Sequence, residues 1–180
     1  MRVLREETVG LIIDVQERLV PVIAKSDEVV KQISRLIKGL DILEVPLLIT
    51  QQYPHGLGET VTEIKEAMNQ FTPLEKMSFS CVDEHSVEKE IRDIHKRDVI
   101  IAGIESHICV MQTAIDLKNK GFRPIVVVDA VGSRKALDKE IALKRLEQEG
   151  VTFATVESIL FELCRFSGNK KFKEISKLIK

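Results

Sequence analysis

The chain has 180 residues, of which 44% are hydrophobic and 31% charged, so it is long and apolar enough to fold as one domain over residues 1–180. Its 27 basic and 28 acidic side chains leave a net charge of −1. This balance excludes the strong field that nucleic acid or an anionic membrane surface would require, and neither is expected as a partner. No apolar run reaches the length of a signal peptide or a membrane span, which predicts a cytoplasmic protein.

Short apolar runs alternate with segments of helical periodicity along the whole chain. Strands are predicted at residues 9–13, 47–50, 71–76, 99–102, 124–128 and 151–155, and helices at 27–44, 60–69, 83–96, 104–119, 138–148, 157–164 and 168–179. Asp27 and Asp138 are the expected N-terminal caps of two of these helices. Because the strands are continuously apolar, they indicate a parallel sheet covered on both faces. The predicted fold is a three-layer α/β domain with a six-stranded, Rossmann-like parallel sheet.

Cys109 occupies a position where a thiol can be reactive. The apolar run before it ends at Gly103, and Ile108, Met111 and Ile115 then recur at helical spacing. Cys109 is therefore expected in the first turn of a helix, where free N–H groups favour a thiolate and can receive an oxyanion. The alternative is that Cys109 is a small buried hydrophobe. The other cysteines, Cys81 and Cys164, are too widely spaced for a zinc ribbon or a disulfide framework.

Polar side chains stand at the ends of several predicted strands. Asp14 follows the first, Lys76 ends the third, Cys109 follows the fourth and Asp129 ends the fifth. Parallel sheets bind ligands at the carboxyl edge of their strands, so these groups are expected on one rim. Asp14 could take the thiol proton and Lys76 could stabilise negative charge. An ordinary ion pair, or Asp14 acting as a helix cap, remains the structural alternative.

Four segments, LIIDVQERL, KMSFSC, AGIESHICVMQTAIDL and VVDAVGSR, resemble the isochorismatase-like cysteine hydrolase family over residues 8–164. The resemblance implies the isochorismatase-like hydrolase fold and a homo-oligomer, whether dimer, tetramer or larger. It implies a catalytic triad of Asp14, Lys76 and Cys109. It also implies a cis peptide between Ile104 and Glu105, and an oxyanion hole formed by the N–H groups of Glu105 and Cys109.

The loop TQQYPHGLG departs from the nicotinamidases of this family, which hold a metal after the second strand. Gln52 stands where those enzymes have an aspartate, and Pro54 where they have a histidine. His55 alone is no metal site. We therefore expect no metal, no other cofactor and no nicotinamidase activity, and the loop is similar to that of uncharacterised isochorismatase-domain proteins.

Four residues near the predicted rim are candidates for substrate binding, namely Gln16, Gln52, Tyr53 and Phe79. For Phe79 the alternative is simple packing, and for Tyr53 it is an ordinary exposed position on a loop.

Three further features are assigned structural roles. His107 lies two residues before Cys109, and residues two apart on a helix do not face each other, so we expect it at the rim rather than in a Cys–His dyad. Ser133 and Arg134 are expected to order that rim. Cys81 could be exposed, whereas Cys164 is expected in the core.

These features favour a cysteine-dependent hydrolase of a small amide or related C–N bond, acting through a thioester on a small-molecule substrate. One alternative is an isochorismatase-type vinyl-ether hydrolase, whose chemistry does not require the cysteine. Another is an inactive scaffold on the same fold, which would predict a damaged triad. A nucleotide-binding Rossmann protein is disfavoured, because no glycine-rich turn follows the first strand.

Overall fold

The computed structural model describes residues 2–180 and contains one six-stranded parallel sheet, as the sequence predicted. The strand order is β3-β2-β1-β4-β5-β6. The strands are β1 (Thr8–Ile13), β2 (Leu47–Gln52), β3 (Leu74–Lys76), β4 (Asp98–Ile104), β5 (Arg123–Gly132) and β6 (Thr152–Ala154). The α-helices are α1 (Ser26–Ile42), α2 (Pro54–Leu57), α3 (Thr62–Lys65), α4 (His85–Asp93), α5 (Met111–Asn119), α6 (Ala136–Gln148), α7 (Val156–Cys164) and α8 (Phe172–Ile179).

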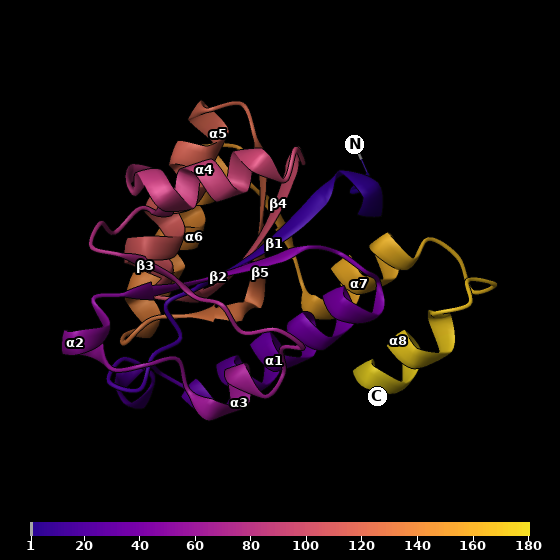
Figure 1. Ribbon diagram of the computed structural model, residues 1–180, viewed down its shortest axis with the longest axis horizontal. Coiled ribbons are helices and arrows are strands. Elements are labelled where there is room, and N and C mark those ends of the chain that lie inside the picture. Colours follow the sequence, from indigo (N-terminus) through magenta and orange to yellow (C-terminus); the bar gives the residue numbers. More distant parts are fainter. Residues whose placement is uncertain (1) are drawn as a thin grey trace.

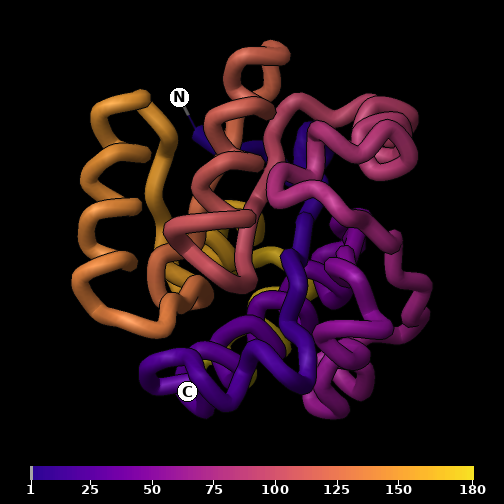
Figure 2. The backbone as a smooth tube through the Cα atoms, turned by 90° about the vertical axis from the view of Figure 1, so that its left-hand side faces the viewer, coloured from indigo at the N-terminus to yellow at the C-terminus, as the bar shows by residue number. Residues whose placement is uncertain are grey.

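Helices cover both faces of the sheet (Figure 1). One apolar core lies between the sheet and α1, α3, α7 and α8, and the other between the sheet and α4, α5 and α6. In Figure 2, α6, α5 and α4 follow one another across the upper half of the molecule. Successive β1 residues alternate between the two cores: Ile12 enters the first, and Leu11 and Ile13 enter the second. This double burial explains why the strands read as unbroken apolar runs.

The strand order reverses between β1 and β4, the two central strands. From β1 the chain proceeds outward to β2 and β3, and from β4 it proceeds the other way to β5 and β6. Loops that leave adjacent strands in opposite directions open a crevice at the carboxyl edge of the sheet. Asp14 follows β1 and Glu105 follows β4, so both begin loops at this reversal.

All six strands differ from their predicted bounds by at least one residue, and the third and fifth differ for identifiable reasons. The third covers Leu74–Lys76 instead of 71–76, because Pro73 has no N–H to donate to a ladder and pairing is confined to Thr50–Gln52 of β2. The fifth continues to Gly132, well past the predicted end at 128. Its register with β4 shifts between Ile101 and Gly103, after which pairing resumes at Val131 and Gly132. An irregularity of this kind cannot be read from an apolar run.

Both predicted caps are wrong. Helix α1 begins at Ser26 with Lys25 as its N-cap, and Asp27 lies inside the first turn. Helix α6 begins at Ala136, so Asp138 also lies inside the first turn rather than before it. Acidic side chains are favourable throughout a first helical turn, which makes the capping residue hard to assign from sequence. The predicted helix at 60–69 forms only over Thr62–Lys65, and the predicted loop before it contains the short helix α2.

Gly103 is required where β4 passes β1. Its φ is +127°, and a Cβ built on it would lie 2.1 Å from the backbone oxygen of Ile13. We expect Gly103→Ala to lower the free energy of unfolding by about 3 kcal/mol or more, because backbone atoms of a central strand cannot move aside. Urea denaturation measures this. Gly121→Ala is the control, since its φ is +88° but no atom lies within 4 Å of the added Cβ; its cost is expected near 1 kcal/mol.

Candidate active site

Asp14 and Lys76 form a fully buried ion pair at the carboxyl edge of the sheet. The Nζ of Lys76 lies 2.7 Å from Oδ2 of Asp14, and neither side chain is exposed to solvent. The other carboxylate oxygen of Asp14, Oδ1, accepts a hydrogen bond of 2.7 Å from the hydroxyl of Thr50. Asp14 has a φ of 52°, a left-handed conformation that turns the chain sharply at the end of β1. Asp14 is thus held by two neighbouring strands and does not cap a helix.

The ammonium group of Lys76 is further held by the backbone of the following turn. It donates to the carbonyl oxygens of Ser78 at 2.9 Å and Phe79 at 3.2 Å, and lies 3.5 Å from Oε1 of Gln52. Burial is the largest single influence and favours the neutral amine, but the Asp14 carboxylate together with Cys81 and Cys109 outweighs it and raises the pKa of Lys76. Lys76 therefore stays charged at neutral pH.

Cys109 lies in a π-helical turn, Ser106–Val110, that joins β4 to α5. Its Sγ lies 3.3 Å from Oε1 of Gln52, and it is near enough to Asp14 and Lys76 for both charges to act on the thiol. Burial and then the negative charge of Asp14 raise the pKa of the Cys109 thiol, and Lys76 only partly offsets them. Burial and the Asp14 charge therefore outweigh the N–H groups of the turn, and the folded protein favours the thiol over the thiolate. The three predicted side chains nevertheless lie together, delivered by three separate segments.

Cys81 lies behind this group and is fully buried, so the expectation that it could be exposed is wrong. Its Sγ is 4.0 Å from the Thr50 hydroxyl, and its backbone N–H donates to Thr113. Burial, with a further contribution from Asp14, raises the pKa of Cys81 to about 12. Cys164 is buried in the first core, as predicted.

The four candidate substrate-binding residues differ in exposure: two are buried or half-buried, and two are exposed. Gln16 is fully buried; its amide donates to the carbonyl oxygens of Gln52 and Gly58 and accepts from the N–H of Gln52. These bonds show that Gln16 stabilises the loop between Gln52 and Gly58. Gln52 is half-buried and lies beside the thiol. Tyr53 and Phe79 are 47% and 53% exposed, which is unusual for aromatic side chains and leaves both free to contact a ligand.

The segment before Cys109 is held in place by Arg134, which follows β5. The peptide between Ile104 and Glu105 is cis, as the family resemblance implied. The carboxylate of Glu105 accepts hydrogen bonds from the backbone N–H of Arg134 at 3.0 Å and from its Nε at 3.2 Å. Arg134 thus orders the rim, as expected.

His107 makes polar contacts with residues outside the Asp14, Lys76 and Cys109 group. Its Nδ1 lies 3.0 Å from Oγ of Ser133, and its Nε2 lies 3.9 Å from a carboxylate oxygen of Asp138. These contacts agree with the expected rim position and with the absence of a Cys–His dyad. Asp129, also expected on the rim, instead accepts a hydrogen bond from the N–H of Val156.

His55 is exposed on α2. Within residues 2–180, no three His, Cys, Asp or Glu side chains are grouped so that they could hold a metal ion. No helix in this part of the chain has the length and apolar character needed to cross a membrane.

Thr50 is the residue of this site that sequence reasoning missed. It ends a predicted strand beside Gln51 and Gln52, and a threonine in a strand gives no signal of its own. We expect Thr50→Val to cost about 1–3 kcal/mol of folding free energy, because it leaves the buried Oδ1 of Asp14 without its donor. Urea denaturation measures this cost. Thr50→Ser keeps the hydroxyl and should restore the stability, whereas equal stability of the two variants would contradict the role assigned to the hydroxyl.

The fold and these side chains define a class: a parallel α/β protein of the hydrolase type, with a thiol beside a buried carboxylate–ammonium pair. Comparison with known proteins agrees. The isochorismatase domain matches residues 8–158. Isochorismatase domain-containing protein 2A of Mus musculus is 38% identical over 179 residues, covering 99% of this chain and 85% of that protein. The human isochorismatase domain-containing protein 2 is also 38% identical and covers 99% and 86%. The chain therefore belongs to the isochorismatase family.

Solved structures show the same architecture. The MAR1 ribonuclease of Caenorhabditis elegans is 37% identical, with a TM-score of 0.93 over 99% of this chain and 92% of that one. YcaC of Escherichia coli, described as an octameric hydrolase of unknown specificity, has a TM-score of 0.94 over 99% and 89% of the two chains, but is only 22% identical. The second likeness concerns the fold alone. The predicted isochorismatase-family hydrolase fold is confirmed.

Proposed function

We propose that this protein is a cysteine-dependent hydrolase of a small amide or related C–N bond, with Asp14, Lys76 and Cys109 as its catalytic residues. The observation that carries the proposal is the buried Asp14–Lys76 pair, 2.7 Å apart, whose charges act on a thiol that is itself only 5% exposed. Burying two charges is costly, and hydrophobic residues would serve stability as well. A buried pair at the carboxyl edge of the sheet is therefore better explained by chemistry than by folding.

In the first step, Asp14 takes the proton of Cys109 as the sulfur attacks the carbonyl carbon and an S–C bond forms. The electron pair moves to the carbonyl oxygen, and the resulting oxyanion is stabilised by the N–H groups of Glu105 and Cys109. Lys76 offsets the negative charge that the attack brings into the site. Because the resting residue is a thiol, transfer of its proton to Asp14 must accompany the attack.

In the second step, the C–N bond breaks and Asp14 returns its proton to the leaving amine, which leaves a thioester on Cys109. Asp14 then takes a proton from a water molecule that attacks the thioester carbon. The acid departs, and the sulfur recovers a proton from Asp14. Each cycle thus consumes one amide and one water, and the enzyme returns to its starting state without a cofactor.

The substrate is expected to be small. Gln52 lies beside the thiol, and the exposed Tyr53 and Phe79 supply apolar contact surface nearby. Exposed aromatic side chains at a site of this kind would also suit contact with a second copy of the chain, so we propose a homo-oligomer. Two points support this proposal: the description of YcaC as an octamer, and the family resemblance.

Two other activities are alternatives. The first is vinyl-ether hydrolysis, which would not depend on Cys109. The second is RNA cleavage, because the similar Caenorhabditis elegans protein is named a ribonuclease, and this activity would require binding to a polyanion. The net charge of −1 disfavours the second. An amide and nitrile screen run beside vinyl-ether and RNA substrates separates the three activities.

The rate of Cys109 alkylation by iodoacetamide against pH tests whether the three residues form one site. Asp14 raises the pKa of the thiol and Lys76 lowers it. We therefore expect Asp14→Asn to move the alkylation profile to lower pH and Lys76→Met to move it to higher pH. Mass spectrometry distinguishes Cys109 from the less exposed Cys81 and Cys164.

A further outcome separates reactivity from catalysis. Asp14→Asn should alkylate faster at neutral pH yet lose amide turnover, because it keeps the thiol but has no base to accept its proton. If neither variant moves the profile, Asp14 and Lys76 do not act on Cys109, and the inactive scaffold becomes the better description.

A further inference from the structure

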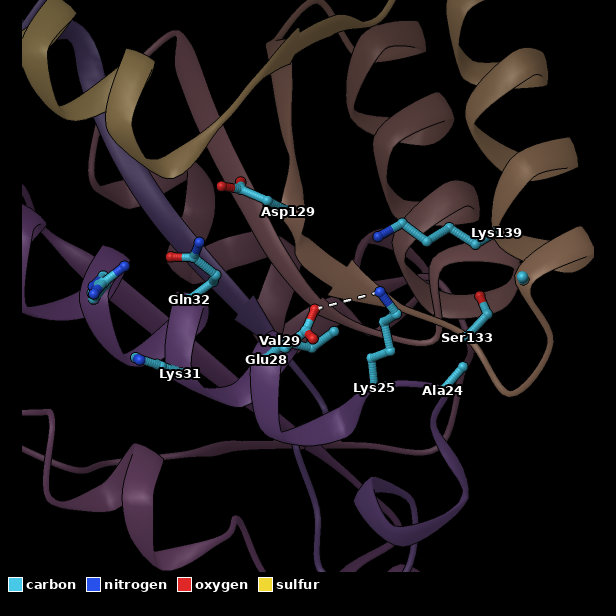
Figure 3. Close-up of a pocket in the computed structure, with 12 residues that line it drawn as sticks. Ala24, Lys25, Glu28, Val29, Lys31, Gln32, Asp129, Ser133 and Lys139 are labelled. Carbon is cyan, nitrogen blue, oxygen red and sulfur yellow. Dashed lines mark ion pairs between the residues drawn. The ribbon is translucent and has the colours of Figure 1, made fainter. Parts of the chain in front are cut away.

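A cavity of about 540 Å³, separate from the candidate active site, lies between the N-terminal half of α1, the end of β5 and the start of α6 (Figure 3). Asp14, Lys76 and Cys109 do not line it. In Figure 3 the side chains of Lys139 and Gln32 extend toward Asp129 from opposite sides of this space. A cavity of this size accommodates a small organic molecule.

The lining carries more positive than negative charge. Lys25, Lys31, Arg35 and Lys139 face only two acidic residues, Glu28 and Asp129. Lys25 lies 3.8 Å from Glu28, but no described residue forms an ion pair with Lys31, Arg35 or Lys139.

The floor of the cavity has two polar groups that lack suitable partners. Lys139 is half-buried, and the one hydrogen bond found for its Nζ goes to a neutral group, the carbonyl oxygen of Val131, at 2.7 Å. Burial lowers the pKa of Lys139, although Asp129 opposes this. The side-chain amide of Gln32 has a buried oxygen without a hydrogen-bond partner among the described residues. A desolvated ammonium without an ion pair favours a bound anion, whereas the Gln32 oxygen, an acceptor, favours a donor such as a hydroxyl group on the same molecule.

The wall of the cavity is in contact with the candidate active site. Ser133 lines the cavity, and its Oγ lies 3.0 Å from Nδ1 of His107, in the same turn as Cys109. The carbonyl oxygen of Ser133 accepts a hydrogen bond from Ala24, also in the lining. The next residue, Arg134, holds the carboxylate of Glu105. Residues 131–134 therefore separate the two sites and bond to both.

We infer that this cavity is a regulatory site for a small molecule bearing a phosphate or carboxylate group, which acts on the Cys109 turn through residues 131–134. The binding half of this inference stands on the cavity alone, and the regulatory half rests on the proposed function. A ligand that draws Lys139 away from Val131 would release the strand end that carries Ser133. The expected consequence is a change in the position of His107 and hence in the reactivity of Cys109.

Isothermal titration of the whole protein with inorganic phosphate, and separately with citrate, tests the binding at constant ionic strength. Lys139→Met and Arg35→Gln should each weaken binding by about tenfold or more. Lys38→Met is the matched control, because Lys38 lies on the same helix outside this cavity. The stronger of the two probes identifies the anionic group. No binding of either, or equal weakening in Lys38→Met, would overturn the inference.

Alkylation of Cys109 tests the regulation. A saturating concentration of the stronger probe should change the alkylation rate by about threefold or more, and Ser133→Ala should still bind the probe but lose this response. An unchanged rate in the natural protein would contradict a regulatory role. Cys109→Ala should bind the probe with unchanged affinity, so a failure of the proposed hydrolase would leave the binding result intact.

Discussion

Asp14→Asn is expected to lower the free energy of unfolding by about 3–5 kcal/mol, because it leaves the ammonium group of Lys76 buried without its carboxylate. Lys76→Met should be comparably destabilising, since it leaves a buried carboxylate. The double variant should be much less destabilised than the sum of the two, because it removes both charges. Urea denaturation of the four proteins at pH 7 gives the coupling energy directly.

A surface pair provides the control for this experiment. Lys144 and Glu140 lie 2.6 Å apart, a shorter separation than in the buried pair, but their side chains are 63% and 58% exposed. Lys144→Met should leave the stability unchanged within error, because water screens exposed charges. Additive effects of Asp14→Asn and Lys76→Met would contradict the coupling.

The pair also predicts a direction for the pH dependence. The pKa of Lys76 is raised in the folded protein, so its contribution to stability is fully present below the ordinary lysine pKa and is lost as the pH rises through the folded value. Cys81 and Cys109 act in the same window: both are held as thiols when folded, and their ionisation in the unfolded chain favours unfolding above about pH 8.5. Stability should therefore decline at alkaline pH.

Cys109→Ser is expected to reduce kcat/KM for the amide found in the screen by about 10³-fold or more, because a hydroxyl is a far weaker nucleophile than a thiol at this position. The fold should be preserved, since the two side chains differ by one atom. Mass spectrometry of a rapidly quenched reaction should show an acyl adduct on the natural protein and none on the variant.

Cys164→Ala is the matched control, because Cys164 is equally buried but belongs to the core beneath α7. It should retain turnover and the adduct. Full activity of Cys109→Ser would exclude a thioester mechanism and favour the vinyl-ether reaction, in which the cysteine is not required.

The sequence by itself determined the architecture and which polar groups meet at the candidate site. Uninterrupted apolar runs such as residues 99–102 can only be buried on both sides, so they predicted a covered parallel sheet. Parallel strands end on one edge, so Asp14, Lys76 and Cys109 could be placed on a common rim. Both inferences depend on local pattern and on the direction of the chain, which the order of residues contains.

The tertiary structure decided the properties that depend on distance and on water. A place in the first turn of a helix favours a thiolate at Cys109, but the pKa of this thiol is raised by burial and by the Asp14 charge, both of which arise only in the folded protein. Thr50 gained its role because β2 lies beside β1, 36 residues away in the chain. The end of β5 depended on a change of register with β4. Such features are set by neighbours distant in sequence, and no local pattern records them.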